Sequence, residues 1–546
     1  MPEESVRPLE RGLAVLRALA AAEPGQLRAG DLARATGLAR STVDRVVTTL
    51  ARLGYVRPRG QELHLAPRLM ELGNAYLAAS GLTGEVAART ARLADELDES
   101  VSLAVPDGDG VRFVTQAARR RAMSVAFRIG DLLPPERCAP GALFADAWDE
   151  ERWAAWRARV AAYPPTRPIR HCRPARRPPA VPELADRVAH ARRSGWALDD
   201  QLIEPGLIAV AVPVRDAAGR VRYALSAVSH TSRHTAQGLA AAVLPRLRAE
   251  AEQLAGLSGT DAPPDADGRA PAREATDPAA AKDELGPGFL QSLARGLAVL
   301  RALGGARGEG LPLTALAEAT GLPRATARRC LHTLEQAGYA AHDGRLFRPL
   351  PRILELGHAA LSGLTFAELA EPHLRELADR VRQSASATVL DGTDIRYVAR
   401  AATVRVMSVH ITVGTRFPAY ATAMGRVLLA GLPADERERL LTAAPPRALT
   451  PRTVTDPGEL ARVLDRAAAE GHATADQELE DGLRSVAVPV RDAAGRVVAA
   501  VNVAQHAGTD PLSRTRDALL PALRATAAAI ETDLHIAARF NTVRMS

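Results

Sequence analysis

Arginine, serine and threonine residues gather at the start of two short segments, where they could form hydrogen bonds with nucleic acid. The segments are LARSTVDRVVTTLARLG (38–54) and LPRATARRCLHTLEQAG (322–338). Arginine can bond guanine through two N–H groups, and serine or threonine can bond bases or phosphates. The candidate contacts are Arg40, Ser41, Thr42 and Arg45 in the first segment, and Arg324, Thr326, Arg328 and Arg329 in the second.

A second group of reactive side chains is the acidic stretch ADQELEDG (475–482). Paired carboxylates could support acid–base catalysis, but such a run is also typical of a solvated turn before a buried strand, and we favour the turn. The sequence has no GxSxG, HExxH, GxxxxGK[ST] or GxGxxG motif, and its 13 histidines show no metal-ligand spacing. We therefore expect neither an enzyme nor a bound metal or cofactor.

The chain contains the same unit twice. RGLAVLRAL occupies 11–19 and 295–303, and VAVPVRDAAGRV occupies 210–221 and 486–497. The offset between equivalent residues is 284 in the first half of each unit and 276 near its end. Copy 1 therefore has eight extra residues, which we expect in the Pro- and Arg-rich stretch 166–179.

Each copy opens with a pattern typical of a winged helix-turn-helix. In copy 1, apolar residues at helical spacing predict helices over 11–20, 27–37 and 38–54, the last two ending at glycines. Val43, Val46, Val47 and Leu50 would face the core of this module. The stretch 55–65 predicts a hairpin, and copy 2 repeats the plan in 313–349. The hairpins add Arg57, Arg59, Arg345 and Arg348 as candidate contacts to phosphate or to the minor groove.

The larger part of each copy mixes helices with strands. ATVLDGTDIRYVAR (387–400) and RSVAVPVRDAAGRVVAAVNVA (484–504) each predict two strands around a turn, and YATAMGRVLLAGL (420–432) predicts a helix that starts with small residues. The fold class expected is α+β, with an antiparallel sheet in each larger domain. The expected domains are 1–66 and 288–350 (winged helices), 67–257 and 351–540 (larger domains), and 258–287 (a flexible linker rich in Pro, Ala, Asp and Gly).

The net charge of +7 is concentrated in the two winged-helix segments. Residues 1–66 carry ten Arg against seven Asp and Glu, and residues 288–350 carry eight Arg against four. A basic excess confined to two small modules favours a phosphate-rich partner, double-stranded DNA. The three cysteines, Cys138, Cys172 and Cys330, are far apart and are expected to be reduced thiols. No apolar run approaches the length of a membrane span, so we expect a cytoplasmic protein without a membrane partner.

These segments together resemble the IclR family of bacterial transcription regulators. The matching pieces are SLARGLAVLRAL, LAEATGLPRATARRCLHTLEQAGY, PRILELG, YATAMGRVLLA and DQELEDGLRSVAVPVRDAAGRVVAAVNV. The resemblance covers nearly the whole chain, twice, and copy 2 is most similar to the branch that controls aromatic-acid catabolism through protocatechuate and β-ketoadipate. It implies a winged helix joined to an effector domain with a GAF/PAS-like sheet, acting as repressor or activator at palindromic or near-palindromic sites.

The resemblance also implies an effector pocket for a small organic acid, aromatic or dicarboxylic. Carried over to copy 2, its residues are Ala423, Met424, Asp476, Leu483, Ser485 and Asn502. Copy 1 departs from the pattern, because Pro140, Ala209 and Ser226 replace Met424, Ser485 and Asn502, whereas Asp200 matches Asp476. Copy 1 is therefore expected either to bind a different ligand or to act only as a dimerisation body.

The duplication has two explanations. One chain could supply both winged helices for the two half-sites of a palindrome, as an intramolecular pseudo-dimer. Alternatively, each copy pairs with its counterpart in another chain, as a homo-oligomer. Because the recognition segments differ, we expect half-sites that are not perfect mirror images. Two competing functions are an architectural DNA-binding protein and an enzyme that uses the acidic stretch.

Overall fold

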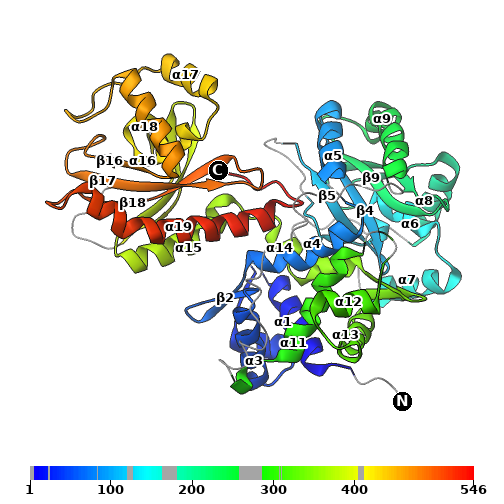
Figure 1. Cartoon of the computed structure of the whole chain (residues 1–546). Helices are drawn as coiled ribbons and strands as arrows, with labels where there is room; N and C mark the ends of the chain where they lie inside the picture. The colour runs from blue at the N-terminus through cyan, green and yellow to red at the C-terminus, as the bar shows by residue number, and fades with distance from the viewer. Residues whose placement is uncertain are drawn as a thin grey trace. The chain divides into compact units, whose positions relative to one another are not determined.

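The computed structural model describes residues 5–22, 25–82, 84–119, 127–162, 181–257, 286–306, 308, 310–403 and 411–545. The chain forms two compact units. Unit 1 comprises Met1–Ser362 with Arg539–Asn541, and unit 2 comprises Gly363–Ala538 with Thr542–Ser546. Unit 1 therefore holds both winged helices and the larger domain of copy 1, and unit 2 holds the larger domain of copy 2 (Figure 1).

Each winged helix has three helices and a small antiparallel sheet. Copy 1 forms α1 (Arg7–Ala21), β1 (Gln26–Arg28), α2 (Ala29–Thr36), α3 (Arg40–Arg52), β2 (Val56–Arg59) and β3 (Glu62–Leu65). Copy 2 forms α11 (Gln291–Ala302), β10 (Leu311–Pro312), α12 (Leu313–Thr320), α13 (Arg324–Gln336), β11 (Ala340–Asp343) and β12 (Leu346–Pro349). The expected hairpins are present, and each gains a third strand, β1 or β10, too short for the sequence pattern to reveal.

The turn between the second and third helices requires glycine in both copies. Gly37 and Gly321 take left-handed conformations, with φ of 67° and 64°, which a residue with a Cβ adopts only at a cost. The buried face of α3 contains Val43, Val46 and Leu50, as predicted, whereas Val47 is half-buried.

The larger domains repeat one plan around a six-stranded antiparallel sheet. Copy 1 forms α5 (Gly84–Leu97), β4 (Ser100–Asp107), β5 (Gly110–Ala117), β6 (Leu132–Leu133), η2 (Pro135–Arg137), α6 (Ala139–Ala145), α7 (Glu150–Ala162), α8 (Val181–Ser194), β7 (Ala197–Asp200), β8 (Leu207–Arg215), β9 (Val221–His230) and α9 (Ala236–Leu257). Copy 2 forms α15 (Phe366–Val381), β13 (Ala385–Asp391), β14 (Asp394–Ala401), β15 (Arg416–Pro418), η6 (Ala419–Ala421), α16 (Ala423–Ala430), α17 (Ala434–Ala443), α18 (Pro457–Glu470), β16 (Ala473–Asp476), β17 (Leu483–Arg491), β18 (Val497–His506) and α19 (Leu512–Ala538). The strand orders, β6-β5-β4-β9-β8-β7 and β15-β14-β13-β18-β17-β16, are equivalent.

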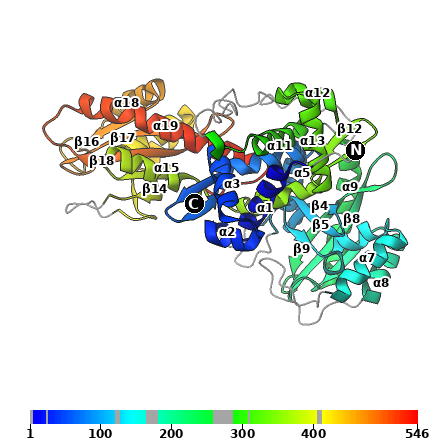
Figure 2. The ribbon, with the colours of Figure 1, turned by 90° about the horizontal axis from the view of Figure 1, so that it is seen from below.

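Helices cover both faces of each sheet. In copy 1, α6 packs on one face and α5 and α9 on the other, and α7 and α8 lie on the α6 side (Figure 2). In copy 2, α16 and α18 cover one face, and α15 and α19 cover the opposite one. The predicted α+β class with two repeats is thus confirmed. The predicted extra loop of copy 1 (166–179) and most of the predicted linker lie outside the described residues, and η3 (Gly286–Gly288) follows them.

The connection from winged helix to larger domain differs between the copies. In copy 1 a short turn, η1 (Pro67–Leu69), leads into a regular helix, α4 (Met70–Ala79). In copy 2 the equivalent stretch is η5 (Pro351–Leu356) and the single turn α14 (His358–Leu361). The break falls at Gly357, whose φ of 145° is open to glycine but strained for other residues.

The two winged helices pack against each other through α1 and α11, within one chain (Figure 1). Gly12 of α1 faces the side chain of Leu293, and Gly296 of α11 faces Leu9 in the same way. Both leucines are fully buried. Gly12 and Gly296, like Leu9 and Leu293, are equivalent in the repeat. The nonapeptide RGLAVLRAL occurs twice because each copy supplies one side of this crossing.

We expect Gly12→Ala to destabilise unit 1 by about 1–3 kcal/mol, because the added Cβ would overlap the buried Leu293 side chain. Urea unfolding of the full chain measures this. The matched control is Gly256→Ala in α9, where an added Cβ meets no atom within 4 Å and should stabilise slightly through helix propensity. Equal midpoints for both variants would contradict the close crossing.

Candidate nucleic-acid interface and effector pocket

The first turns of α3 and α13 present polar and basic side chains to solvent. The exposed residues are Arg40, Ser41 and Arg45 in copy 1 and Arg324, Arg328 and Arg329 in copy 2, while Thr42 and Thr326 are half-buried. On the hairpins, Arg59, Arg345 and Arg348 are exposed and Arg57 is half-buried. The structure thus places each predicted contact on the helix or hairpin expected for it, and their contact with DNA remains a prediction.

The first two turns of the two recognition helices differ in charge at one position. Arg40 Nε donates to Asp44 Oδ1 at 3.3 Å, and both side chains are more than half exposed. The residue equivalent to Asp44 in copy 2 is Arg328. An exposed pair of this kind contributes about 0–1 kcal/mol, so it can open when DNA binds. The first two turns of α13 are therefore more positive than those of α3, although the two whole helices have the same formal net charge.

Matched hydrogen bonds tie each recognition helix to the other copy. The backbone N–H of Val6 donates to Thr333 Oγ1 at 2.9 Å, and the N–H of Leu290 donates to Thr49 Oγ1 at 2.9 Å. Val6 and Leu290 precede α1 and α11, whereas Thr49 and Thr333 lie in α3 and α13. Each bond joins residues at equivalent places in the repeat, so the two recognition helices are held as a pseudo-symmetric pair.

In the larger domain of copy 2, α16 packs its small residues against one face of the sheet. Thr422 caps the helix by accepting from the N–H of Gly425 at 3.0 Å. Ala423 and Met424 are buried in the same cluster as Ala487 of β17 and Ala500 of β18. Because side chains alternate along a strand, this α16 face also receives Leu483, Ser485 and Asn502. Five of the six predicted pocket residues therefore share one face.

Asp476 lies on the other face of the sheet. Its carboxylate accepts from Arg484 Nε at 2.9 Å, and Arg484 also donates to the carbonyl of Asp510 and to Thr515 Oγ1 of α19. Neighbouring Ala475, not Asp476, points toward α16. The predicted role of Asp476 in the pocket therefore gains no support, since its carboxylate already joins β16 and β17 to the helix behind them.

Polar side chains that the sequence analysis missed lie beside Asn502 on the α16 face. The strand register aligns Asn502 of β18 with Ser386 of β13, and Ser386 with Arg400 of β14. Asn502 Oδ1 and Thr388 Oγ1 are buried without a hydrogen-bond partner among the described residues. Such orphaned acceptors are rare in proteins and suit a ligand with donors of its own. No motif marks Arg400, because only pairing across β13 brings it to this row.

The acidic stretch ADQELEDG is not merely a solvated turn. Glu478 is buried and pairs with Arg426 of α16, with Arg426 Nη1 at 2.6 Å from Glu478 Oε1. Arg426 Nε also donates to the carbonyl of Tyr420 at 3.0 Å. The expectation of a solvated turn is wrong for Glu478. Its partner, Arg426, is 52 residues away in the sequence, so the ion pair forms only in the folded chain and no local pattern reveals it.

Copy 1 has the same row of positions with different chemistry. Ser226, Ser102 and Gln116 align across β9, β4 and β5, and Gln116 stands where copy 2 has Arg400. The pair Arg426–Glu478 is replaced by Ala142 and Leu202. Instead, Arg187 of α8 donates to the carbonyl of Glu136, which is equivalent to Tyr420, at 3.0 Å. In both copies an arginine thus donates to the equivalent carbonyl, but the arginine belongs to α8 in copy 1 and to α16 in copy 2.

Asp199 of β7 is the carboxylate near Arg187, and it is fully buried. Its Oδ1 accepts from the N–H of Leu202 at 2.8 Å, while Oδ2 has no partner among the described residues. Burial raises the pKa of Asp199 to about 7, although the Leu202 hydrogen bond and the charge of Arg187 oppose the rise. The α6 face of copy 1 therefore contains a carboxyl group that is partly protonated at neutral pH.

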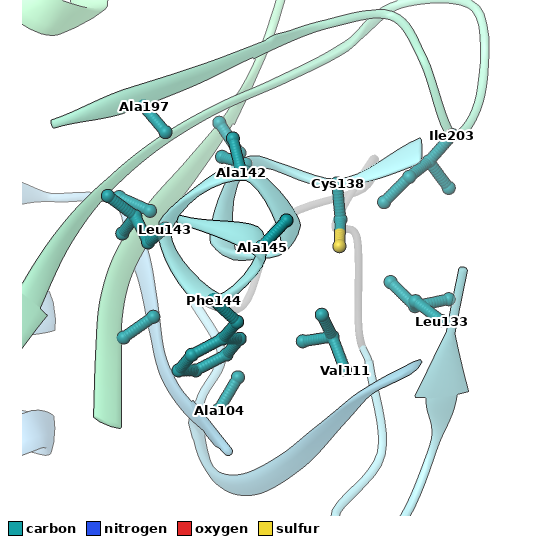
Figure 3. Close-up of a cluster of buried hydrophobic side chains, with 14 of the residues drawn as sticks. Ala104, Val111, Leu133, Cys138, Ala142, Leu143, Phe144, Ala145, Ala197 and Ile203 are labelled. Carbon is teal, nitrogen blue, oxygen red and sulfur yellow. The ribbon is translucent and has the colours of Figure 1, made fainter. Parts of the chain in front are cut away.

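The rest of the α6 face in copy 1 is filled by apolar side chains (Figure 3). Phe144, Cys138 and Val111 gather around α6. Phe113 and Phe127 stack with ring centroids 4.5 Å apart, and Trp148, Trp153 and Trp156 form a further aromatic group. Copy 2 has smaller or more polar residues at several equivalent positions, including Thr422 for Cys138.

The sequence of both repeats matches two family models. The model for the IclR helix-turn-helix domain matches 8–60 and 292–344, and the model for the C-terminal domain of the bacterial transcriptional regulator IclR matches 74–255 and 358–532. These segments cover most of the chain. The protein belongs to the IclR family of bacterial transcriptional regulators, as a tandem duplication.

Individual relatives match the length of about one repeat. The chain is 45% identical over 240 residues to the Pca regulon regulatory protein of Pseudomonas putida, covering 44% of this chain and 82% of that protein. It is 33% identical over 244 residues to the p-hydroxybenzoate hydroxylase transcriptional activator of Acinetobacter baylyi, covering 44% and 90%. Among solved structures, a transcriptional regulator from Rhodococcus sp. RHA1 shows 49% identity, covering 46% and 100%, with a TM-score of 0.44.

Within the described residues, no helix is long and apolar enough to cross a membrane, and no group of three or more His, Cys, Asp or Glu is placed to hold a metal ion.

The Asp199 carboxyl should make the stability of unit 1 fall as pH rises. The folded protein retains this proton up to about pH 7, whereas the unfolded chain releases it near 3.8. Stability is therefore lost between these two values and levels off above pH 7. We expect the thermal unfolding midpoint of Asp199→Asn to fall less between pH 5 and about 7.5 than that of the wild type.

The matched control for this titration is Asp200→Asn, which removes the neighbouring exposed carboxyl. Its midpoint should follow the wild-type pH profile closely, because burial is the main cause of the raised pKa of Asp199 and the charge of Asp200 contributes least. A profile of Asp199→Asn that runs parallel to the wild type would show that the buried carboxyl does not carry the effect.

Proposed function

We propose that this protein is a ligand-responsive transcription regulator whose two winged helices, from one chain, bind the two halves of a near-palindromic operator. The paired contacts between α1 and α11, and the matched bonds from Val6 and Leu290, support this arrangement. The base and phosphate contacts would come from Arg40, Ser41, Thr42, Arg45, Arg57, Arg59, Arg324, Thr326, Arg328, Arg329, Arg345 and Arg348. Pairing within a chain makes the second contact intramolecular and raises its effective concentration.

The larger domain of copy 2 would bind a small organic acid, aromatic or dicarboxylic, and thereby control catabolic genes. The observation that carries this proposal is the row Asn502, Ser386 and Arg400 on the α16 face. Arginine binds a carboxylate through paired N–H groups, and the orphaned oxygens of Asn502 and Thr388 would accept from a hydroxyl of the ligand. Ala423, Met424, Leu483 and Ser485 would complete the walls. The names of two relatives, Pca regulon regulatory protein and p-hydroxybenzoate hydroxylase transcriptional activator, agree with an aromatic-acid pathway.

Copy 1 would not sense the same acid. Its row has Gln116 in place of Arg400, and Asp199 adds a carboxyl to the same face. A second carboxylate next to Asp199 would be repelled, and the aromatic filling leaves less room. The larger domain of copy 1 would therefore act as a structural partner of the winged helices in unit 1.

Fluorescence anisotropy tests the function directly. The protein is titrated onto DNA from upstream of its own gene and neighbouring genes, with and without a panel of acids that includes protocatechuate and β-ketoadipate. We expect site-specific binding that one acid shifts. Specific binding that no acid shifts would refute the effector assignment and favour an architectural DNA-binding protein.

Arg400→Gln should weaken the response to the acid at least tenfold, because it removes the carboxylate's cation while sparing the DNA-binding unit. The readout is the acid concentration that gives the half-maximal anisotropy shift. Arg396→Gln is the matched control, because Arg396 lies on the same strand, outside the row that contains Arg400, and pairs with Asp391 at 3.1 Å. Equal loss in both variants would contradict a specific role for Arg400.

A further inference from the structure

A hollow of about 550 Å³ opens between the N-terminus of α1 and the helices α11 and α13. It is formed by both copies, since α1 belongs to copy 1 and the two other helices belong to copy 2. Its lining consists of Ser5, Val6, Arg7, Pro8, Ser292, Arg295, Thr326, Arg329 and Cys330. All of these residues belong to unit 1.

Positive charge and hydroxyl groups dominate this hollow. Arg7, Arg295 and Arg329 contribute their side chains, and no acidic residue lines it. Within the described part of the chain, none of the three guanidinium groups forms a salt bridge. Arg329 and Arg295 lie near enough to the Cys330 thiol to oppose the rise of its pKa caused by burial. Three cations without acidic partners around one cavity repel each other, and an anion bound between them would offset this repulsion.

The equivalent place on the opposite side of the pseudo-symmetric pair has different residues. Phe289 stands where Ser5 stands in copy 1, and it is 5% exposed and packs with Ala294 and Leu53. Gln291 and Val46 replace Arg7 and Cys330. An aromatic ring and an uncharged amide thus occupy the positions of a small hydroxyl and a cation. Arg11 and Arg45 stand where Arg295 and Arg329 stand, so the two sides share these arginines and differ at the positions of Ser5, Arg7 and Cys330.

We propose that this hollow binds a backbone phosphate of the operator beside the half-site read by copy 2. The proposal rests on the proposed function, because it assumes that α13 contacts DNA. Arg329 is exposed and Thr326 is half-buried on α13, and both are predicted DNA contacts, so an anion in the hollow lies next to the recognition surface. Guanidinium groups with nearby hydroxyls are the usual partners of phosphate. Arg7 would reach this phosphate from copy 1, so the chain's first copy strengthens DNA binding by its second.

The salt dependence of DNA binding tests this proposal. The logarithm of the binding constant falls with the logarithm of salt concentration, with a slope of about −0.9 per neutralised phosphate. Removing one contacted phosphate should therefore reduce the magnitude of the slope by about 0.9. We expect this reduction for Arg295→Gln and for Arg7→Gln, measured by fluorescence anisotropy on an operator that the wild type binds specifically.

Ser5→Phe distinguishes the effect of filling the hollow from the effect of removing a positive charge. It introduces the residue that copy 2 has at the equivalent position and should reduce the slope as the arginine variants do, although no charge is lost. Ser5→Ala leaves the hollow open with its three arginines and should retain the wild-type slope, because the slope counts neutralised phosphates, even if loss of the hydroxyl lowers the affinity. Arg220→Gln is the charge control, because Arg220 is 81% exposed and pairs with Asp216 in a turn of the larger domain.

Unchanged slopes for Arg295→Gln, Arg7→Gln and Ser5→Phe, with folding verified by thermal melts, would overturn the proposal. An equal reduction in Arg220→Gln would also overturn it. If the slopes are unchanged but inorganic phosphate stabilises the wild type and not Arg295→Gln, the hollow binds a free phosphorylated ligand and the DNA assignment is wrong. Failure of the proposed function would appear earlier, as absence of specific binding by the wild type.

Discussion

The crossing of α1 and α11 is the contact on which the arrangement of unit 1 depends. Each helix offers a glycine to a buried leucine of the other, and the close approach leaves no space for a Cβ. Because the crossing sets the distance between the two first helices, it also sets where α3 and α13 lie relative to each other. The bonds from Val6 and Leu290 then fix each recognition helix to the opposite copy. The pseudo-symmetric pairing of the two recognition helices therefore depends on a few matched residues at one helix crossing.

Around this symmetric contact the two copies have diverged in charge. Asp44 and Arg328 occupy equivalent places on the recognition helices, and Gln116 and Arg400 occupy equivalent places on the sheets of the larger domains. The carbonyl of Glu136 in η2, or of Tyr420 in η6, shows how such divergence is tolerated. In copy 2 the carbonyl accepts from Arg426 of α16, and in copy 1 it accepts from Arg187 of α8. A buried carboxylate lies near each arginine, Glu478 in copy 2 and Asp199 in copy 1. The carbonyl thus keeps an arginine partner even though the helix that supplies the arginine differs.

The sequence was sufficient for the helices and hairpins of both winged helices, because their apolar spacing and glycine turns are local signals. It was also sufficient for the strands of β13, β14, β17 and β18, which have clear turns between them. It was not sufficient for β1 and β10, whose two or three residues are strands only because β3 and β12 lie beside them. Arg400 and Ser386 likewise became neighbours through pairing across the sheet. Asp476 was misplaced because one step along a strand reverses the face to which a side chain points.

Pairing within one chain has a consequence for how such a regulator evolves. In a homodimer every substitution appears twice, so a change that suits one half of the operator is imposed on the other half as well. Here Phe289 and Ser5 occupy equivalent positions, yet one packs in an apolar cluster and the other lines a basic hollow. Each position can be selected separately, without disturbing its counterpart. The proposed operator would then be free to lose its own symmetry, one half at a time, without loss of recognition by the protein.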